Sequence, residues 1–394
     1  MHIVFFNHPP FLGSQSMPRF ADLLANGMKE KGHQVESWTP KAFFYRAPVP
    51  GTLKKWMGYI DQYILFPAQV KAKLKKYPAD TLFVFTDHAL GPWVPLVAKK
   101  PHVIHCHDFL AQQSALGQIK ENPVTKTGKL YQKFIYNGYS KGKNFISVSE
   151  KTRSDLHTIL GYHPQLSEVI YNGLSQQFKP TNDATGDVLI NKEDNIDTGN
   201  GYILHIGGNQ WYKNRIGVIE IYNAWRKKYD NVMPLVMIGA KPNEKILTEY
   251  NNSPVRNDIH FLTGKSDAYV RNAFAHATVF LFPSLAEGFG WPIAEAMASG
   301  CPVVTTNEAP MTEVAGGVAF FINRRPANTK HVADWANNSA DVVNNATTLT
   351  ISERQSVVND GIENSKRFNT NLMLEKVEGI YTGLTERLNR TQII

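Results

Sequence analysis

Short apolar runs alternate with longer helical segments through the first half of the chain. Residues 16–32 predict a helix that ends at Gly32, because glycine readily adopts the left-handed conformation that closes a helix. The apolar runs are of the kind expected for buried strands. They cover residues 2–6, 33–39, 81–87, 102–108, 143–150 and 167–173. Strands that alternate with helices predict a doubly wound parallel sheet.

A polar stretch without periodicity, residues 179–200, predicts a surface linker, and a second alternation begins directly after it. The last segment, residues 369–390, has an amphipathic 3.6-residue period and predicts one closing helix. Between the two, the pattern predicts strands at residues 202–208, 234–240 and 259–264 and a helix at 214–229.

The two alternations together predict an α/β protein with two Rossmann-like, doubly wound domains. The N-terminal domain is expected to cover residues 1–178 together with the closing segment 369–394. The C-terminal domain is expected to cover residues 201–368. In such sheets a ligand lies beyond the carboxyl ends of the strands, so we expect a ligand in a cleft between the two domains.

The stretch "PSLAEGFGWPIAEAMASG", residues 283–300, predicts a glycine loop followed by a short helix between two buried strands. Proline suits the first helical turn, so the helix is expected to open near Pro292 and to end at Gly300. The amides of Ile293 and Ala294 would then have no intrahelical acceptors and would form an anion site at the positive end of the helix.

Two carboxylates flank this predicted anion site, Glu287 in the loop and Glu295 in the first turn of the helix. A carboxylate accepts two hydrogen bonds and therefore suits a vicinal diol of a sugar. Two diol clamps around a phosphate site describe a nucleotide sugar. The alternative is that Glu295 only complements the helix dipole and that Glu287 is a solvated loop residue.

Two other glycine loops are candidates for phosphate binding. Residues 207–214 place Lys213 near a helix start, where it could hold a diphosphate as a point charge or be a solvated lysine. Residues 11–17 form a second glycine loop that leads into a helix. Neither loop has the G-x-G-x-x-G spacing of dinucleotide-binding oxidoreductases.

The sequence "HCHD" at residues 105–108 follows a buried strand. His105 and His107 lie two residues apart and so point to the same face of that strand, which permits a zinc pair without an identified third ligand. His107 and Asp108 at the strand end are expected to face the cleft, although a core or loop histidine is the commoner outcome.

Charge and composition narrow the class of partner. The net charge of +8 and the isoelectric point of about 9.2 favour anionic partners such as phosphates, nucleic acid or acidic lipid surfaces. No zinc-finger spacing or RNA-binding aromatic signature is present, so nucleic acid is disfavoured. The N-terminus has no signal-peptide character, no run approaches a membrane span, and Cys106 and Cys301 are expected to be reduced. A cytoplasmic protein is expected.

Taken together, these motifs resemble a retaining glycosyltransferase of family 4 with the GT-B fold. The segment "FPSLAEGFGWPIAEAMASGCPVVTTN" is similar to the Glu-x7-Glu element of that family. The resemblance extends through "LLANGMKEKGHQV", "VIHCHD", "ISVSEKTRSDL", "VIYNGLSQQFKP" and "YILHIGGNQWYKN". It also implies that the closing helix crosses back to the N-terminal domain.

The resemblance implies a role for each matched position. Glu295 would bind the ribose, Glu287 would bind the donor hexose, and Lys213 would neutralise the diphosphate. His107 would lie near the sugar and stabilise oxocarbenium-like charge through its backbone carbonyl and ring. The remaining donor contacts would come from the backbone or from glycines: Gly13, Gly208, Leu262, Thr263, Phe289, Gly290 and Ile293.

The chain departs from the family pattern in its phosphate loop. The family has an arginine directly after the first glycine, and this chain has Gly208 there, so Arg215 or Asn209 is a candidate to compensate. The chain lacks an evident D-x-D motif, so no metal or other cofactor is expected. Retention is expected to proceed by front-face attack, with the departing phosphate oxygen taking the proton of the acceptor.

The resemblance implies a hexosyltransferase. Its expected donor is a UDP-sugar of UDP-glucose type, and GDP-mannose is the second candidate. The acceptor would be a saccharide or a lipid-linked molecule in polysaccharide or glycoconjugate assembly. Residues 41–78 mix aromatics with lysines, which suits a peripheral membrane contact or a helix with a solvated lysine face. The competing classes are a nucleotide-sugar 2-epimerase and a non-catalytic nucleotide-sugar-binding protein.

Overall fold

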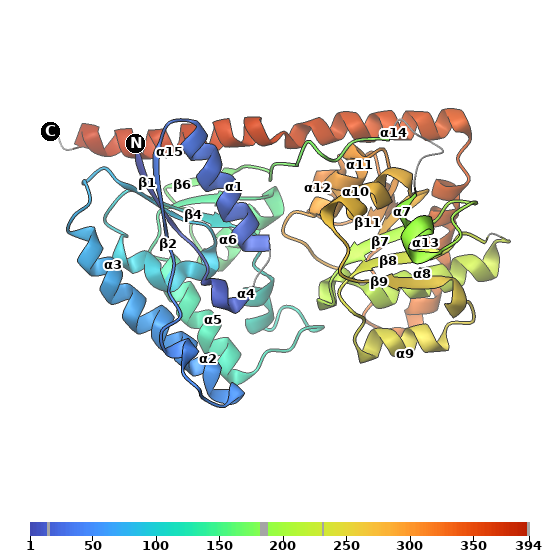
Figure 1. The fold of residues 1–394 in the computed structure, drawn as a ribbon, viewed down its shortest axis with the longest axis horizontal. Helices are drawn as coiled ribbons and strands as arrows, with labels where there is room; N and C mark the ends of the chain where they lie inside the picture. The colour runs from blue at the N-terminus through green and yellow to red at the C-terminus, as the bar shows by residue number, and fades with distance from the viewer. Residues whose placement is uncertain (14–15, 182–187, 231, 392–394) are drawn as a thin grey trace. The chain divides into compact units, whose positions relative to one another are not determined.

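The computed structural model describes residues 1–13, 16–181, 188–230 and 232–391. The chain divides into two compact units, Met1–Tyr171 with Asn371–Ile394, and Asn172–Thr370. Each unit contains one six-stranded sheet in which all paired strands are parallel (Figure 1). The prediction of two doubly wound α/β domains is confirmed.

The sheet of unit 1 is built from the apolar runs of the first half of the chain. Its four inner strands are largely buried because parallel sheets are covered on both faces, whereas the edge strands β2 and β6 are partly exposed. The strand order reverses direction between β1 and β3. In spatial order the strands are β2 (Gln34–Trp38), β1 (His2–Phe6), β3 (Leu82–Phe85), β4 (His102–Cys106), β5 (Asn144–Ser147) and β6 (Leu166–Val169).

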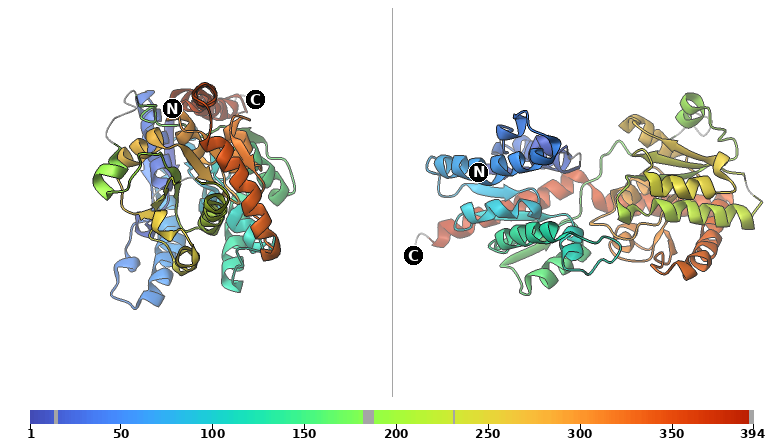
Figure 2. Two further views of the ribbon diagram at one scale, coloured as in Figure 1. Left: turned by 90° about the vertical axis from the view of Figure 1, so that its right-hand side faces the viewer. Right: turned by 90° about the horizontal axis from the view of Figure 1, so that it is seen from below.

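Helices cover both faces of this sheet (Figure 2). One face packs against α1 (Ser16–Glu30) and the closing helix α15 (Thr370–Thr391), since Phe20 and Tyr381 both contact His105. The opposite face carries an aromatic core in which Phe6 and Trp93 participate. It packs against α3 (Phe66–Leu74), α5 (Lys126–Tyr139), α6 (Glu150–Leu160) and the turn segment His88–Leu96. Two further helices of unit 1 are α2 (Gly51–Ile60) and α4 (Leu110–Ala115).

The closing helix α15 is held to unit 1 by polar and apolar contacts. Glu378 forms an ion pair with Lys31 at 2.9 Å and a hydrogen bond with the ring of His33 at 2.8 Å. A Cβ at Gly27 would lie 2.5 Å from the Leu374 side chain, so glycine permits α1 and α15 to approach closely. The predicted return of the C-terminal helix to the N-terminal domain is therefore confirmed.

The sheet of unit 2 follows the same plan. Its strand order reverses between β7 and β10, which are neighbours in the sheet although two strands separate them along the chain. In spatial order the strands are β12 (Phe320–Ile322), β11 (Val303–Thr306), β10 (Val279–Phe282), β7 (Ile203–Gly207), β8 (Leu235–Gly239) and β9 (Ile259–Leu262).

The helices of unit 2 also cover both faces of its sheet. On one face α8 (Arg215–Lys228) and α13 (Val332–Thr347) bury the main apolar cluster, with α9 (Glu244–Asn252) beside them. Further helices of unit 2 are α10 (Asp267–His276), α11 (Trp291–Ala298), α12 (Met311–Ala315) and α14 (Ile351–Ser365). Among the described residues, no helix is long and apolar enough to cross a membrane.

The segment predicted to be an irregular linker contains a helix. Of residues 179–200, residues 182–187 lie outside the described part of the chain, and α7 (Leu189–Asp194) follows them. The prediction is wrong for α7, whose Ile190 is fully buried and whose first amide, that of Leu189, donates to Asn272 at 3.0 Å. A single buried apolar residue, Ile190, in a polar segment does not produce the 3.6-residue hydrophobic period by which a helix is predicted from sequence.

Candidate functional site

The reversal of strand order in unit 2 brings two loops to one edge of the sheet. In open parallel sheets ligands bind beyond the carboxyl ends of the strands, where the strand order reverses. Here the loop after β7 leads through the 3-10 turn Trp211–Lys213 into α8, and the loop after β10 leads into α11. These are the loops in which the sequence placed Lys213 and Glu287.

Lys213 and Glu287 form an ion pair at this edge. The Lys213 ammonium donates to both carboxylate oxygens of Glu287, at 2.8 and 3.0 Å, and the Ser284 hydroxyl donates to Oε1 at 2.8 Å. The Lys213 side chain is 16% exposed and that of Glu287 is 8% exposed. The alternative interpretation of both residues as solvated surface charges is wrong. Two residues predicted to act on different parts of a ligand thus contact each other directly.

The two loops are also joined through the backbone. The amide of Leu285 donates to the carbonyl of Tyr212 at 2.7 Å. Asn214 has a φ of 51° and caps α8 by accepting from the amide of Gly217. Its side-chain amide donates to the carbonyl of Pro283 at 2.9 Å. These bonds fix the positions from which Lys213 and Glu287 reach one another.

The start of α11 differs in two details from the prediction. Gly290, with φ of 102°, is the residue before the helix, so α11 begins at Trp291 and Glu295 lies in its second turn rather than its first. The amide of Ile293 donates to the Gly290 carbonyl at 3.0 Å, so the expectation that it has no intrahelical acceptor is wrong. The Gly290 conformation causes both differences. Gly300, with φ of 76°, follows the helix end as predicted.

Arg215 and Asn209, the two candidates to compensate for Gly208, are hydrogen-bonded to each other. The Arg215 guanidinium donates through Nη1 to Asn209 at 2.5 Å and to the carbonyl of Ala240 at 2.8 Å. It is 3% exposed, and burial lowers its pKa to about 10. Asn209 in turn donates to the carbonyl of Lys241 at 2.6 Å. Arg215 therefore ties the glycine loop to the loop after β8.

The other predicted donor contacts in unit 2 occupy the same edge of the sheet. Leu262 is the last residue of β9 and is buried, and Thr263 directly after it is exposed. Phe289 is buried, with its ring 5.3 Å from that of Phe368, so its side chain serves packing and leaves only its backbone for a ligand. Gly208 lies in the loop where a Cβ would meet the Gln210 side chain at 2.3 Å.

In unit 1, His107 lies directly after β4 and is buried. Its Nε2 donates to the Thr86 carbonyl at 2.9 Å, and burial lowers the pKa of its ring, which favours the neutral form. Its backbone carbonyl already accepts from the Thr152 hydroxyl at 3.3 Å. The neighbouring Asp108 accepts from the amide of Leu110 at 3.0 Å, and burial raises the pKa of its carboxyl group.

The alternative of a zinc pair at His105 and His107 is not supported. Both rings contact Phe20, so they do share one face as predicted. However, Nε2 of His105 is bonded to the Tyr381 hydroxyl at 2.8 Å. Within the described ranges, no group of three or more His, Cys, Asp or Glu side chains is arranged to hold a metal ion.

A cluster of ionisable residues that no sequence motif predicted lies where the strand order of unit 1 reverses. His8 after β1 bonds Asp87 after β3 at 2.9 Å, and Nδ1 of His88 lies 3.0 Å from the same carboxylate. Burial alone would raise the pKa of Asp87, but His88 and His8 together hold it well below its usual range. The position of Asp87 at the end of a predicted strand was the only signal in the sequence. The sequence does not show that β1 and β3 are neighbours, which is what brings His8 to Asp87.

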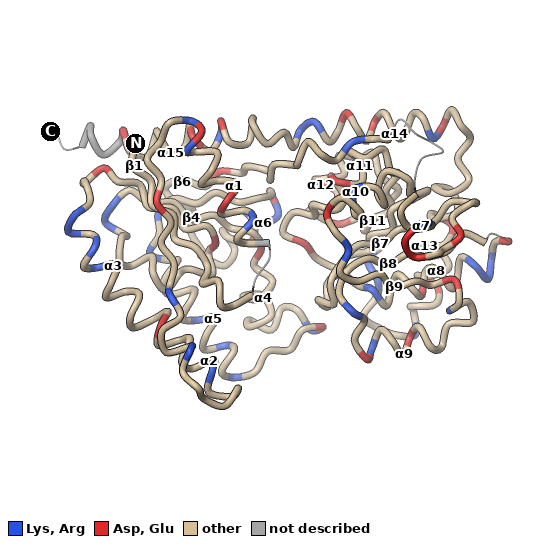
Figure 3. The backbone as a smooth tube through the Cα atoms, in the orientation of Figure 1, with Lys and Arg blue, Asp and Glu red and all other residues tan. Residues whose placement is uncertain are grey.

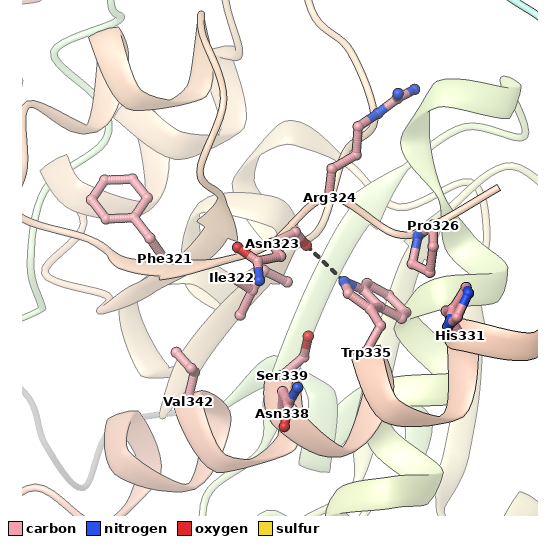
Figure 4. A pocket seen from close by; sticks show the side chains of 10 residues that line it. All are labelled: Phe321, Ile322, Asn323, Arg324, Pro326, His331, Trp335, Asn338, Ser339 and Val342. Atoms are coloured by element: carbon pink, nitrogen blue, oxygen red, sulfur yellow. Dashed lines mark hydrogen bonds between the residues drawn. The ribbon is translucent and has the colours of Figure 1, made fainter. Parts of the chain in front are cut away.

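Two cavities lie away from the Lys213–Glu287 pair. One of about 950 Å³ in unit 1 adjoins the turn that precedes Gly13; Phe11, Phe43, Tyr45, Lys41 and Arg46 are among its lining residues. Gly13 itself has φ of 68° and ends that turn, and the next two residues of its predicted loop lie outside the described ranges. The other cavity, of about 340 Å³, lies between β12 and α13 of unit 2, where Trp335 donates to the Asn323 carbonyl (Figure 4). It contains none of the predicted site residues.

Comparison with known proteins agrees with this architecture. Residues 17–178 match the family described as Glycosyltransferase Family 4, and residues 189–345 match Glycosyl transferases group 1. The chain is 27% identical over 187 residues to the O-antigen chain mannosyltransferase B of Escherichia coli, which covers 47% of this chain and 49% of that relative. In that match the chain spans about half the length of the relative.

Two further similarities extend over more of the chain. The lipopolysaccharide glucosyltransferase WaaG of Escherichia coli is 23% identical over 294 residues, which covers 72% of this chain and 74% of that protein. The crystal structure of Anabaena HepE in complex with UDP superposes with a TM-score of 0.68 at 15% identity, and covers 97% of this chain and all of that one. The chain therefore belongs to the group 1, family 4 glycosyltransferases and has the GT-B fold.

Proposed function

We propose that the chain is a retaining, metal-independent hexosyltransferase that moves a hexose from a UDP-sugar, of UDP-glucose type, to a saccharide or lipid-linked acceptor. The observation that carries this proposal is the Lys213–Glu287 pair at the point where the strand order of unit 2 reverses. Lys213 can neutralise a diphosphate and Glu287 can accept from sugar hydroxyls, and Glu287 lies in the loop that leads into α11. Polysaccharide or glycoconjugate assembly is the expected setting.

The donor would be bound by three groups with separate tasks. Glu295 on α11 would accept from the ribose hydroxyls, and Glu287 would accept from the hexose. Lys213 would release part of its bond to Glu287 and meet the diphosphate, whose negative charge grows as the glycosidic bond breaks. The backbone at Leu262 and Thr263 would contact the base, and the backbone at Phe289 and Gly290 would contact the sugar. Gly208 would lie beside the diphosphate, at the place where the family pattern has an arginine.

The reaction would conserve the anomeric configuration without a covalent intermediate. The bond between the anomeric carbon and the phosphate oxygen breaks, and a bond from the acceptor hydroxyl oxygen forms on the same face. The proton of that hydroxyl passes to the departing phosphate oxygen, which leaves as part of UDP. His107 and Gly13, in unit 1, are proposed to contribute to the sugar and diphosphate contacts. A covalent hexose adduct on Glu287 would contradict this route.

The names of the relatives support a hexose as the transferred sugar and suggest two candidate donors. One relative is named a glucosyltransferase, and a structural neighbour was solved with UDP, which supports UDP-glucose. The name of the mannosyltransferase relative supports GDP-mannose as the second candidate. The cavity in unit 1, with aromatic lining and two cationic residues, Lys41 and Arg46, supports an acceptor that has apolar and anionic parts. We place the protein in the cytoplasm, because the proposed nucleotide-sugar donor is found there.

A thermal-shift panel tests the donor. UDP-glucose, UDP-galactose, UDP-N-acetylglucosamine and GDP-mannose are added to the protein with EDTA present. A donor at one hundred times its Kd should raise the free energy of unfolding by about 2.7 kcal/mol. Stabilisation by UDP-glucose in EDTA supports the proposal, and stabilisation by GDP-mannose alone assigns the second donor. An absence of stabilisation by every nucleotide sugar would contradict it. Product formation in a single turnover then separates a transferase from a binding protein or an epimerase.

A further inference from the structure

Four large apolar side chains are exposed along two neighbouring helical segments of unit 1. Leu53 and Trp56 on α2 are 45% and 58% exposed, and Leu130 and Phe134 on α5 are 68% and 45% exposed. Isolated exposed apolar residues are ordinary, but a contiguous group marks an interaction site. Whether these four residues form one surface depends on how α2 and α5 pack.

The two helices meet along an aromatic seam that joins these residues. Tyr59 stacks on Tyr131 at 5.5 Å, and Trp56 meets the Tyr59 ring edge-on at 5.7 Å. The π-helical turn after α2, residues Asp61–Leu65, places Tyr63 against Phe134 at 5.2 Å. The hydroxyls of Tyr63 and Tyr131 are 2.7 Å apart. Trp56 and Phe134 thus flank one seam, and α2 and α5 lie side by side at one end of unit 1 (Figure 1).

Exposed lysines surround this seam, and no exposed acid accompanies them on the same helices. They are Lys55, Lys126, Lys129 and Lys133. Figure 3 marks the basic positions of unit 1 in blue along the backbone. The single acid of residues 41–76, Asp61, is 1% exposed, and its carboxylate accepts from the amides of Phe43, Phe44 and Tyr45. It therefore offers no counter-charge at the surface. We call the four apolar residues and these four lysines the α2–α5 face.

The distribution of charge along the chain supports the same conclusion. Residues 41–76 and 122–143 carry thirteen of the 42 lysines and arginines but one of the 34 acids. These two segments have a net charge of +12, so the rest of the chain has a net charge of −4. The excess of positive charge therefore lies in these two segments of unit 1. They contain the four lysines of the α2–α5 face and also the lysines on and beside α3 that serve as the control below. The charge of the face favours an anionic partner.

We propose that the α2–α5 face binds the surface of an anionic lipid bilayer. Lysines alone would suit any polyanion, but a tryptophan and aliphatic residues among them suit an interface where charged head groups lie above hydrocarbon. The flexible lysine stems can reach the head groups while Trp56, Leu130 and Phe134 enter the boundary below them. The proposal does not depend on the donor or on the reaction. It extends the interpretation of residues 41–78 to α5.

Vesicle co-sedimentation tests the proposal with matched variants. Vesicles of phosphatidylcholine with one third phosphatidylglycerol should bind the protein in 50 mM salt, and binding should fall steeply in 500 mM salt. Vesicles of phosphatidylcholine alone should bind little. The triple variant Lys126→Gln, Lys129→Gln, Lys133→Gln should lose about a hundredfold in partition coefficient, since each lysine near such a surface contributes roughly fivefold. The same number of charges removed on and beside α3, by Lys71→Gln, Lys75→Gln, Lys76→Gln, should cost far less.

The apolar part of the face has its own test. Trp56→Ser with Phe134→Ser should lower binding at least tenfold, whereas Ile351→Ser, at a 92% exposed apolar position of unit 2, should leave binding unchanged. If the double variant does not fold, quenching of tryptophan emission by brominated lipids replaces it. Quenching should be strong in the wild type and largely lost in Trp56→Phe.

Three outcomes would overturn the proposal. One is an absence of binding to anionic vesicles in 50 mM salt. Another is an equal loss of binding in the α3 control and the α5 variant. The third is tight binding to poly(U) RNA that competes with vesicles and is unaffected by Trp56→Ser with Phe134→Ser, which would assign the face to nucleic acid.

Discussion

At the scale of single residues, the ion pair of Lys213 and Glu287 sets the properties of the site. Both side chains are largely withdrawn from water, and the carboxylate has a third bond from Ser284. Without Lys213, the carboxylate would keep one hydroxyl donor in a poorly hydrated place. Under the proposed roles, a donor diphosphate would compete with Glu287 for the same ammonium group. Phosphate binding would then be coupled to the freedom of Glu287 to hold a sugar.

Lys213→Met tests whether the pair is formed in solution. Removing one partner of a largely buried pair leaves a poorly solvated charge, so the free energy of unfolding should fall by about 2 kcal/mol. Adding Glu287→Gln to Lys213→Met should recover part of this loss. Lys241→Met, at an exposed lysine, should change stability by less than about 0.5 kcal/mol. Urea unfolding of the four proteins measures the effects, and equal stability of Lys213→Met and the wild type would contradict the pair.

Gly208→Arg restores the arginine that the family pattern has and this chain lacks. A Cβ at this position would meet the end of the Gln210 side chain, which is flexible and can move away. A charge-assisted bond to a diphosphate should then tighten UDP binding about tenfold in low salt. Gly208→Leu makes the same steric demand without the charge and should not tighten binding. Isothermal titration with UDP decides, and equal affinities of the two variants would refute a missing phosphate contact.

At the scale of elements, Asn214 connects the two loops of the site. It adopts a left-handed conformation, caps α8 and donates to the loop that carries Glu287. Asn214→Ala should cost about 2 kcal/mol in stability, from the cap and from the backbone conformation together. Asn214→Gly keeps the conformation and should cost less, although it should still weaken donor binding. Asn195→Ala, at another left-handed asparagine outside the site, should leave donor binding unchanged. Equal donor affinity in Asn214→Gly and the wild type would contradict the coupling of the loops.

The helices, strands and loops of the site could be predicted from the sequence, but the contacts between them could not. The strand, glycine loop and helix around residues 279–300 follow from local rules, because apolar runs, Gly290, Pro292 and Gly300 act within a few residues. The left-handed Gly290 nevertheless begins α11 one residue early and gives the Ile293 amide an acceptor. The pair of Lys213 and Glu287 joins residues 74 apart, and only the strand order brings their loops together.

The same limit explains the residues that sequence analysis missed. His8 and Asp87 are 79 residues apart and meet because β1 and β3 are neighbours in the sheet of unit 1. Nothing in the local sequence distinguishes Asp87 from any other aspartate at a strand end. The α2–α5 face also requires the structure, since the pairing of Tyr59 with Tyr131 is what places the lysines of α5 beside Trp56.

At the scale of the whole molecule, each unit contains a neutral histidine deep in its core. Burial lowers the pKa of His105 in unit 1 and of His205 in unit 2 to about 3. In the unfolded chain both titrate near pH 6.5. Between these values the unfolded state binds more protons than the folded state, so stability must fall as the pH falls below about 6.5.

His205→Gln tests this pH dependence. Each buried histidine contributes a slope of up to about 1.4 kcal/mol per pH unit, and the loss continues toward pH 3. Glutamine can keep a donor near the Leu281 carbonyl, to which His205 is now bonded at 2.9 Å, without titrating. Urea unfolding between pH 7.5 and 5 should show a slope that is smaller by one such contribution in the variant. Identical slopes in the two proteins would contradict a neutral, buried His205.

The division of roles between Glu287 and Glu295 is tested most directly by isothermal titration of UDP into the wild type, Glu287→Ala and Glu295→Ala. We propose that Glu295 holds the nucleotide and that Glu287 holds the transferred sugar. Glu287→Ala should therefore bind UDP within about threefold of the wild type and fail to transfer the sugar, whereas Glu295→Ala should lose at least tenfold in UDP affinity. Equal losses of UDP affinity in both variants, or unchanged affinity in both, would contradict this division of roles.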